Sequence, residues 1–317
     1  MSIDVEKYLQ PISEELPCGE NLEYEPAFQE MEEASKGKEA GGIVEAGQEA
    51  EPPEWKEVKA KSLGLLETTR DLRPAVYLAR SVLNLDGWRD FADALAMIQG
   101  FLEKFWDQVW PELDHDDPSD LAGFRVYALQ ELCGAEATLY WVERTPLIRS
   151  RMVGQFSLRD VKIANGDVEA PSSMDSPPTT PAIEAAFRDE EIETETIQGT
   201  LEAINDAIEH TKGIEAGVTA HIDATMSVRL TDLVKMLEEC AAYIQERLQE
   251  RVPIEEEGGE SGEGGSGSGS GSGPGGGDAL SGRINSRTDV LKALDMVNDY
   301  YTRHEPSSPL ALVVRSA

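Results

Sequence analysis

Cysteine is scarce in this sequence, and the three that occur, Cys18, Cys133 and Cys240, lie far apart along the chain. An odd number of widely spaced cysteines offers neither a disulfide framework nor the paired CxxC spacing of a zinc site. We therefore expect three ordinary reduced thiols. Cys18 lies between Pro17 and Gly19 with no basic neighbour to lower its pKa, so it is predicted to be a buried or partly buried structural thiol.

Long apolar runs and basic side chains are also lacking. No apolar stretch approaches the ~20 residues that span a bilayer, and the opening MSIDVEKYLQ lacks the basic and apolar blocks of a signal peptide. The 28 basic residues are outnumbered by 61 acidic ones, which gives a net charge of −33. Such a charge repels phosphate backbones and anionic lipids, so nucleic acid partners and direct membrane insertion are not expected. We predict a soluble, cytoplasmic protein.

Motifs that carry chemistry are sparse as well. The run Asp114–Asp117 reads DHDD, but consecutive residues rarely converge on one metal ion, so we favour an acidic interhelical turn that ends at Asp117-Pro118. His210, His221 and His304 have no nucleophile motif beside them. We therefore predict no catalytic residue, no cofactor, no metal and no enzyme activity. A hydrolase that uses the DHDD run is the competing hypothesis from another class.

Changes in composition predict five segments. All five tryptophans fall in the first part of the chain, a Pro/Ser-rich stretch follows it, and a long Gly/Ser/Glu-rich stretch comes later. The predicted segments are a helical domain (1–165), a Pro/Ser linker (166–181), a helical hairpin (182–252), a disordered Gly/Ser/Glu linker (253–282) and a C-terminal helical oligomerisation segment (283–317). The disordered linker would thus attach the last segment to the rest of the chain without fixing its position relative to the helical domain.

Hydrophobic spacing predicts helices throughout the first domain. Trp55, Val58 and Leu65 recur at helical spacing, and Asp71 with Pro74 marks the start of a second helix. Two further helices are predicted from apolar positions: Phe91, Leu95, Ile98, Leu102, Phe105 and Trp106 in one, and Leu121, Phe124, Ala128, Leu129, Leu132 and Leu139 in the other. Strand alternation is nowhere sustained, so the predicted fold class is all-α.

The hairpin is predicted as two antiparallel helices. Ile197 to Ile208 and Met226 to Leu248 each carry one apolar seam at helical spacing, and a turn is predicted over residues 213–220. A hairpin with one apolar seam needs a third surface to cover it. Either the first domain or another subunit would supply that surface.

The stretch Pro11–Phe28, PISEELPCGENLEYEPAF, is broken by proline and glycine yet rich in apolar side chains. We interpret it as an ordered wrap laid over the helical domain, with Trp106 and Trp110 packed beneath it. Its candidate wrap or docking residues are Leu16, Leu22, Tyr24 and Phe28.

The last 35 residues pose a folding problem, because a unit this small with no cysteine or metal ligand buries too little surface to fold by itself. Residues 282–317 carry five basic and four acidic side chains, so association there avoids the repulsion that the rest of the chain would impose. The candidate oligomer or partner contacts are Val290, Leu294, Val297, Tyr301, Glu305, Pro306, Pro309, Leu310 and Val313.

Four stretches in order then resemble a known family. They are the wrap, WKEVKAKSLGLLETTRDLRPAVYLARSVL, FWDQVWPELDHDDPSD and SRTDVLKALDMVNDYYTRHEPSSPL. Together they resemble the ImpA or TssA proteins of the bacterial type VI secretion system, over residues 8–165 and 283–317. The resemblance implies a non-enzymatic assembly component whose C-terminal region forms a multimeric ring and which contacts baseplate, sheath and tube proteins.

We therefore predict a structural component that docks secretion proteins through its N-terminal domain and multimerises through its C-terminal segment. Several weak contacts displayed on one hub would add through effective concentration. The alternative is a cytoplasmic adaptor or chaperone for secreted effectors. Family members usually continue through a further amphipathic helix after the SPL motif, whereas this sequence ends at Arg315-Ser316-Ala317, so ring closure is expected to depend on that helix.

Overall fold

The computed structural model describes residues 3–37, 53–117, 120–172 and 174–251. The chain divides into two units, Met1–Glu255 and Glu256–Ala317, and the second unit lies outside the described residues. The first unit therefore holds both the predicted helical domain and the predicted hairpin. The segments predicted as a Gly/Ser/Glu linker and an oligomerisation segment stay predictions.

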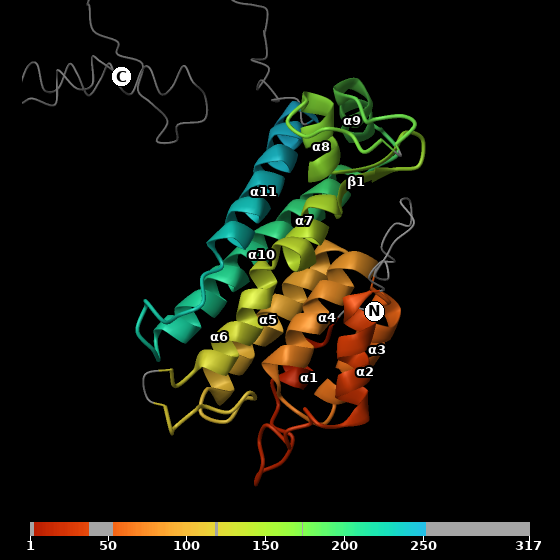
Figure 1. The fold of residues 1–317 in the computed structure, drawn as a ribbon. Coiled ribbons are helices and arrows are strands. Elements are labelled where there is room, and N and C mark those ends of the chain that lie inside the picture. Colours follow the sequence, from red (N-terminus) through yellow and green to blue (C-terminus); the bar gives the residue numbers. More distant parts are fainter. Residues whose placement is uncertain (1–2, 38–52, 118–119, 173, 252–317) are drawn as a thin grey trace, which may run out of the picture. The chain divides into compact units, whose positions relative to one another are not determined.

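Most of the described chain is helical, with one small sheet (Figure 1). The elements are α1 (Val5–Tyr8), α2 (Pro26–Lys36), α3 (Trp55–Leu66), α4 (Leu72–Leu85), α5 (Trp88–Phe105), α6 (Gly123–Gln130), α7 (Tyr140–Arg144), β1 (Pro146–Ser150), β2 (Gly154–Ser157), α8 (Leu158–Asn165), α9 (Thr180–Phe187), α10 (Thr194–Thr219) and α11 (Thr231–Arg251). A 3₁₀ turn (Glu131–Cys133) and a π-helical turn (Ala135–Leu139) connect α6 to α7. No helix in these described ranges is both long and apolar enough to cross a membrane.

The sheet makes the all-α prediction incomplete. β1 and β2 pair in antiparallel register, with Ile148 opposite Phe156 and Ser150 opposite Gly154. The Ser150 hydroxyl accepts the N–H groups of Met152 and Val153, and Gly154 takes a φ of 125°, a conformation that glycine adopts without a Cβ clash. Strands this short give too few alternating positions to be recognised in the sequence.

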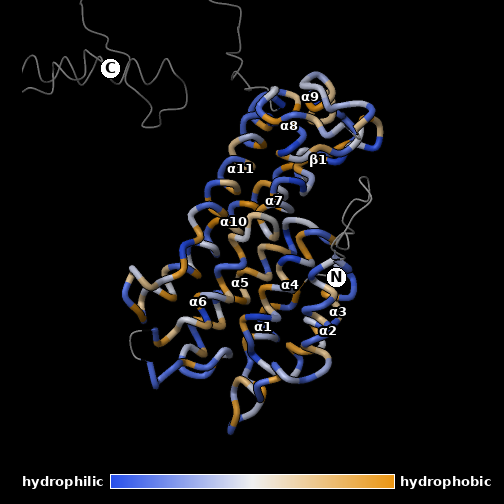
Figure 2. The backbone as a smooth tube through the Cα atoms, in the orientation of Figure 1, coloured by the Kyte–Doolittle hydropathy of each residue, from blue (hydrophilic) through white to orange (hydrophobic). Residues whose placement is uncertain are grey.

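Helices α3, α4 and α5 form the centre of the predicted first domain, and their predicted buried faces are confirmed. Trp55, Val58 and Leu65 are buried on α3, and α5 buries almost every apolar side chain along its length. Asp71 caps α4 by accepting the N–H of Arg73 at 2.9 Å, as its position predicted. Figure 2 shows the apolar positions that recur along these helices. Those of α4 and α5 build the larger core, whereas Trp55, Val58 and Leu65 of α3 pack with α2 in a second cluster.

Helices α10 and α11 pack against each other as the predicted hairpin, and α5 of the first domain packs against α10 (Figure 1). The predicted turn over 213–220 is wrong, because α10 continues to Thr219 and the chain reverses between α10 and α11. Gly213 lies in α10 where a Cβ would come within 2.5 Å of the Gln99 side chain, and Gly217 lies against Leu102. These glycines allow α10 to approach α5 closely, so they mark helix packing rather than a turn.

The segment from Pro11 to Phe28 runs over the ends of α3 and α4. The N–H of Arg70 donates to the carbonyl of Cys18 at 2.8 Å, and Gly19 forms an isolated antiparallel bridge with Thr69. The Trp110 indole donates to the carbonyl of Gly19 at 3.2 Å, so a tryptophan does lie beneath this segment. Irregular backbone is held here by hydrogen bonds from the core rather than by helix formation.

Candidate functional site

The four candidate residues of the N-terminal wrap divide between core and surface. Phe28 is 1% exposed and packs against α3, with the Arg73 guanidinium 4.8 Å from its ring centre. Leu22 is partly buried, whereas Leu16 and Tyr24 are 53% and 82% exposed. Tyr24 and Leu16 are therefore accessible to a partner, and Phe28 secures α2. The nine C-terminal candidates, Val290 to Val313, lie outside the described residues.

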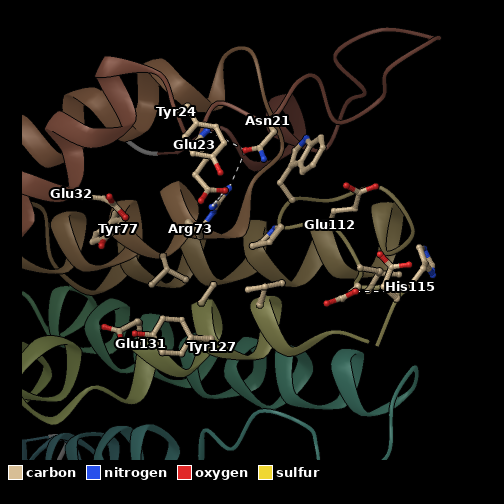
Figure 3. Close-up of a pocket in the computed structure, with 18 of the residues that line it drawn as sticks. Asn21, Glu23, Tyr24, Glu32, Arg73, Tyr77, Glu112, His115, Tyr127 and Glu131 are labelled. Carbon is tan, nitrogen blue, oxygen red and sulfur yellow. Dashed lines mark hydrogen bonds and ion pairs between the residues drawn. The ribbon is translucent and has the colours of Figure 1, made fainter. Parts of the chain in front are cut away.

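A groove of about 710 Å³ opens beside Tyr24. Its walls come from the wrap, α2, α4, the loop Trp110–Asp116 and α6. In Figure 3, Glu23 and Tyr24 lie on one side of Arg73, while Tyr127 and Glu131 lie on the other. Segments more than one hundred residues apart in sequence thus converge on one open depression of the surface.

Exposed aromatic side chains line this groove. Phe124 is 64% exposed and Tyr127 is 75% exposed, and both stand on α6 across from Tyr24. The predicted burial of Phe124 is wrong. α6 buries the face that carries Arg125, Ala128 and Leu129, which turns Phe124 and Tyr127 toward solvent.

Arg125 explains why α6 takes that orientation. Its side chain is fully buried and donates to the carbonyls of Pro111, Val109 and Trp106, at 2.7 Å and 2.6 Å for the first two. The guanidinium also lies 5.1 Å from the centre of the Trp106 ring. Burial lowers the pKa of Arg125 to about 10, which still leaves it charged at neutral pH. This one side chain ties α6 to the loop that follows α5.

Charges at the groove are only partly compensated. Arg73 pairs with Asp71 and Glu23, at 2.8 Å in each case, and the hydrogen bond from Arg73 lowers the pKa of Glu23. No cation within the described ranges pairs with Glu112 or Asp116, which line the same groove. The groove therefore has an acidic rim.

Arg80 is the unusual group of the site. It lines the groove on α4, is 7% exposed, and lies 3.9 Å from its nearest carboxylate, that of Glu131. Its Nε has no hydrogen-bond partner, and its guanidinium rests against the rings of Trp55 and Tyr77. Burial lowers the pKa of Arg80. A buried donor without an acceptor is uncommon, because it lacks the compensation that water would give.

The predicted acidic turn is present at one end of the groove. The Asp114 carboxylate accepts the N–H groups of Asp116 and Asp117 at 3.0 Å and 3.2 Å, which is a local turn interaction. Over the described ranges, no three or more histidine, cysteine, aspartate or glutamate side chains are grouped so that they could share a metal ion.

The remaining chemical candidates occupy structural positions. His210 hydrogen-bonds Gln99 at 2.9 Å, and the His221 ring stacks on Trp106 with centres 4.2 Å apart. Cys18 is 3% exposed, as predicted, and burial raises the pKa of its thiol to about 11. A thiol with this pKa is neutral at physiological pH and is a poor nucleophile. His304 lies outside the described residues.

Sequence reasoning missed the groove. The apolar spacing places Phe124 in a helical stripe and does not single out Tyr127, because a helix of eight residues can carry apolar side chains on two faces. A usable signal was the pair of aromatics three residues apart around Arg125, since a buried arginine forces its neighbours outward. Nothing in the sequence indicates that Arg80 lines the same groove as Tyr24, which lies more than fifty residues away.

Comparison with known proteins places this groove in a recognised region. The family model described as "ImpA, N-terminal, type VI secretion system" matches residues 9–134, which include every residue that lines the groove. The fold is similar to that of the N-terminal domain, including the conserved ImpA_N region, of the TssA component from Burkholderia cenocepacia. That match has a TM-score of 0.62 and 20% sequence identity, and it covers 79% of this chain and 96% of that one.

A curated relative extends the similarity along the whole chain. The type VI secretion system component TssA1 of Pseudomonas aeruginosa PAO1 is 34% identical over 320 residues, which is 99% of this chain and 90% of that protein. An identity of this size over nearly the full length of both proteins shows that the two belong to the same family. The chain belongs to the ImpA/TssA family of type VI secretion system components.

Proposed function

We propose that this protein is a non-enzymatic assembly component that docks baseplate, sheath or tube proteins of the secretion system through its N-terminal domain. The observation that carries the proposal is the groove. Three exposed aromatic side chains, Tyr24, Phe124 and Tyr127, line one depression inside the region that the ImpA family model matches. Exposed aromatic clusters are typical of surfaces that bind other proteins.

The second part of the proposal concerns multimerisation through residues 283–317. It rests on the near balance of charge there and on the apolar positions Val290, Leu294, Val297 and Tyr301. A multimer would display several docking domains at once, and weak contacts made together raise the apparent affinity.

Affinity purification of the full chain from actively secreting cells tests the docking role. We expect baseplate, sheath or tube proteins to co-purify in amounts that exceed those of secreted effectors. An adaptor or chaperone would instead retain effectors without the structural components. That second result would contradict the docking role.

Light scattering of purified protein tests multimerisation. Leu294→Asp together with Val297→Asp should lower the measured mass to that of a smaller oligomer or a monomer, because burying two carboxylates in an apolar contact is strongly unfavourable. Ser268→Asp with Ser270→Asp adds the same charge in the predicted linker and should leave the mass unchanged. An equal mass for all three proteins would remove the C-terminal segment from the proposal.

A further inference from the structure

The groove combines an apolar surface with an excess of negative charge. Six carboxylate side chains and two arginines line it, and one of those arginines, Arg73, is already paired with two carboxylates. Glu32, Glu112 and Asp116 line the groove without a cation partner in the part of the chain that the structure describes. An occupant that brings positive charge would meet uncompensated carboxylates at low cost in desolvation, because the rim is open to water.

The aromatic side chains add a second requirement. Tyr24, Phe124 and Tyr127 present ring faces and edges to solvent at 64% exposure or more. Rings of this kind bind apolar side chains, and their faces also attract arginine or lysine through cation–π contact. Carboxylates and aromatic faces in the same groove therefore both favour a partner that carries lysine or arginine, and the rings also favour apolar side chains.

The two features together also decide between kinds of cationic partner. A metal ion or a polyamine would pair with the carboxylates but has no apolar side chain to pack on the rings, so the combination indicates a polypeptide. The Nε–H of Arg80 is buried behind the groove wall and makes no contact with an occupant.

We propose that the groove binds a polypeptide segment of a partner protein in which lysine or arginine residues alternate with apolar or aromatic ones. The basic side chains pair with the acidic rim, and the apolar ones pack on Phe124 and Tyr127. This inference rests on the proposed docking function and specifies the chemistry of the docked partner. The folded part of this chain is an unsuitable occupant, because the whole chain carries a net charge of −33.

Peptide binding to the full chain tests the proposal. The probe is a short fluorescein-labelled peptide of alternating lysine or arginine and leucine or phenylalanine, with binding followed by fluorescence anisotropy. One matched peptide has glutamate at every basic position, and a second has serine at every apolar position. Both should bind about tenfold or more weakly, because each lacks one of the two interactions. Equal binding of all three peptides would overturn the proposal.

Variants of the protein locate the binding. Phe124→Ser with Tyr127→Ser should weaken binding of the probe about tenfold or more, whereas Met152→Ser, at a side chain 76% exposed and outside the groove, should not change it. Because both groove side chains are exposed, the variants should keep the wild-type circular dichroism spectrum. Unchanged binding by the folded double variant would show that the groove is not the site.

Charge-reversal variants distinguish the effect of the acidic rim on peptide binding from the effect of the protein's overall negative charge. Glu112→Lys with Asp116→Lys should weaken binding about tenfold, while Glu202→Lys with Glu209→Lys on α10 changes the net charge equally and should have less than about a twofold effect. Equal losses in the two double variants would mean that binding is non-specific and would overturn the proposal.

The C-terminal segment of this chain, which is the one part with no excess of acidic residues, is the rival occupant. A synthetic peptide of residues 283–317 should compete with the probe only at a concentration far above that of the probe. Competition at lower concentration, lost in the variant with Phe124→Ser and Tyr127→Ser, would assign the groove to the chain's own segment and overturn the partner assignment.

Different results would contradict the inference about the groove and the proposed docking function. If secretion proteins co-purify with wild-type chain and with the Phe124→Ser, Tyr127→Ser variant equally, docking occurs elsewhere and the inference alone is wrong. If no baseplate, sheath or tube protein co-purifies with the wild-type chain, although the probe binds in the groove, the proposed function is wrong.

Discussion

The N-terminal domain has an anchored side and an open side, which differ in how completely their polar groups are satisfied. On the anchored side, defined by Cys18, Gly19, Thr69 and Arg125, buried groups meet partners: Thr69 donates to the carbonyls of Cys18 and Glu20, and Arg125 donates to three carbonyls. On the open side, defined by Tyr24, Arg80, Phe124 and Tyr127, rings are exposed and a donor is unpaired.

The difference separates residues that hold the fold from residues that are proposed to bind, within one domain. Saturated hydrogen bonds hold irregular backbone in a single conformation, and removing any partner leaves a buried group unsatisfied. Exposed rings and an unpaired donor add little to stability, and the rings remain available to a partner. Substitutions on the anchored side should therefore destabilise the domain, whereas substitutions of the exposed rings on the open side should weaken binding in a protein that stays folded.

Arg125→Met should give the largest loss of stability. It leaves the carbonyls of Pro111, Val109 and Trp106 without donors in the interior, so the free energy of unfolding should fall by about 3–5 kcal/mol. Urea denaturation followed by circular dichroism measures this. A loss of under about 1 kcal/mol would show that the anchored side is not what holds α6.

Gly19→Ala should be the next most severe. Gly19 has a φ of 67°, and a Cβ there would come within 2.1 Å of the Thr68 carbonyl oxygen, so the backbone must shift. We expect a loss of about 2–4 kcal/mol in the free energy of unfolding. The control is Gly64→Ala in α3, where a Cβ meets nothing within 4 Å; it should be stabilising by about 0.5–1 kcal/mol. Equal changes in the free energy of unfolding for the two substitutions would contradict the special role assigned to Gly19.

The buried Cys18 thiol predicts a dependence of stability on alkaline pH. Its pKa is raised to about 11 in the folded chain, whereas the unfolded chain releases the proton near pH 9. Between these values the folded state holds more protons than the unfolded state, so stability falls as pH rises, at up to about 1.4 kcal/mol per pH unit. Wild-type protein should therefore lose about 2 kcal/mol more than Cys18→Ala between pH 8 and pH 10.5. Parallel losses in the two proteins would contradict this.

Arg80→Met should have the smallest effect on stability. The substitution removes an unpaired buried donor and keeps apolar contact with Trp55 and Tyr77, so the free energy of unfolding should change by less than about 1 kcal/mol. The same chemical change at Arg125 is its matched comparison. Similar losses at the two arginines would erase the contrast between the anchored and open sides.

Much of the helical framework could be predicted from the sequence. The buried faces of α3, α4 and α5 follow from apolar residues at helical spacing and from the Asp71 cap, both of which are local signals. The resemblance to the ImpA/TssA family could likewise be seen in ordered stretches of sequence.

The wrong predictions fall where contacts between residues far apart in sequence determine the structure. Gly213 marks close packing on α5 rather than a turn, and α6 orients by the long-range hydrogen bonds of Arg125 rather than by its apolar stripe. The groove needs α2, α4 and α6 to be placed together, which periodicity along one helix does not encode. Local patterns thus gave the elements, and their assembly created the site.

Quantitative affinity purification of the full chain with Phe124→Ser and Tyr127→Ser, against wild type and Met152→Ser, tests the central claim most directly. The account predicts that the groove variant keeps the wild-type unfolding midpoint yet captures about one tenth or less of the amount of baseplate, sheath or tube protein that the other two capture. Capture equal to that of the wild type by the folded groove variant would contradict it.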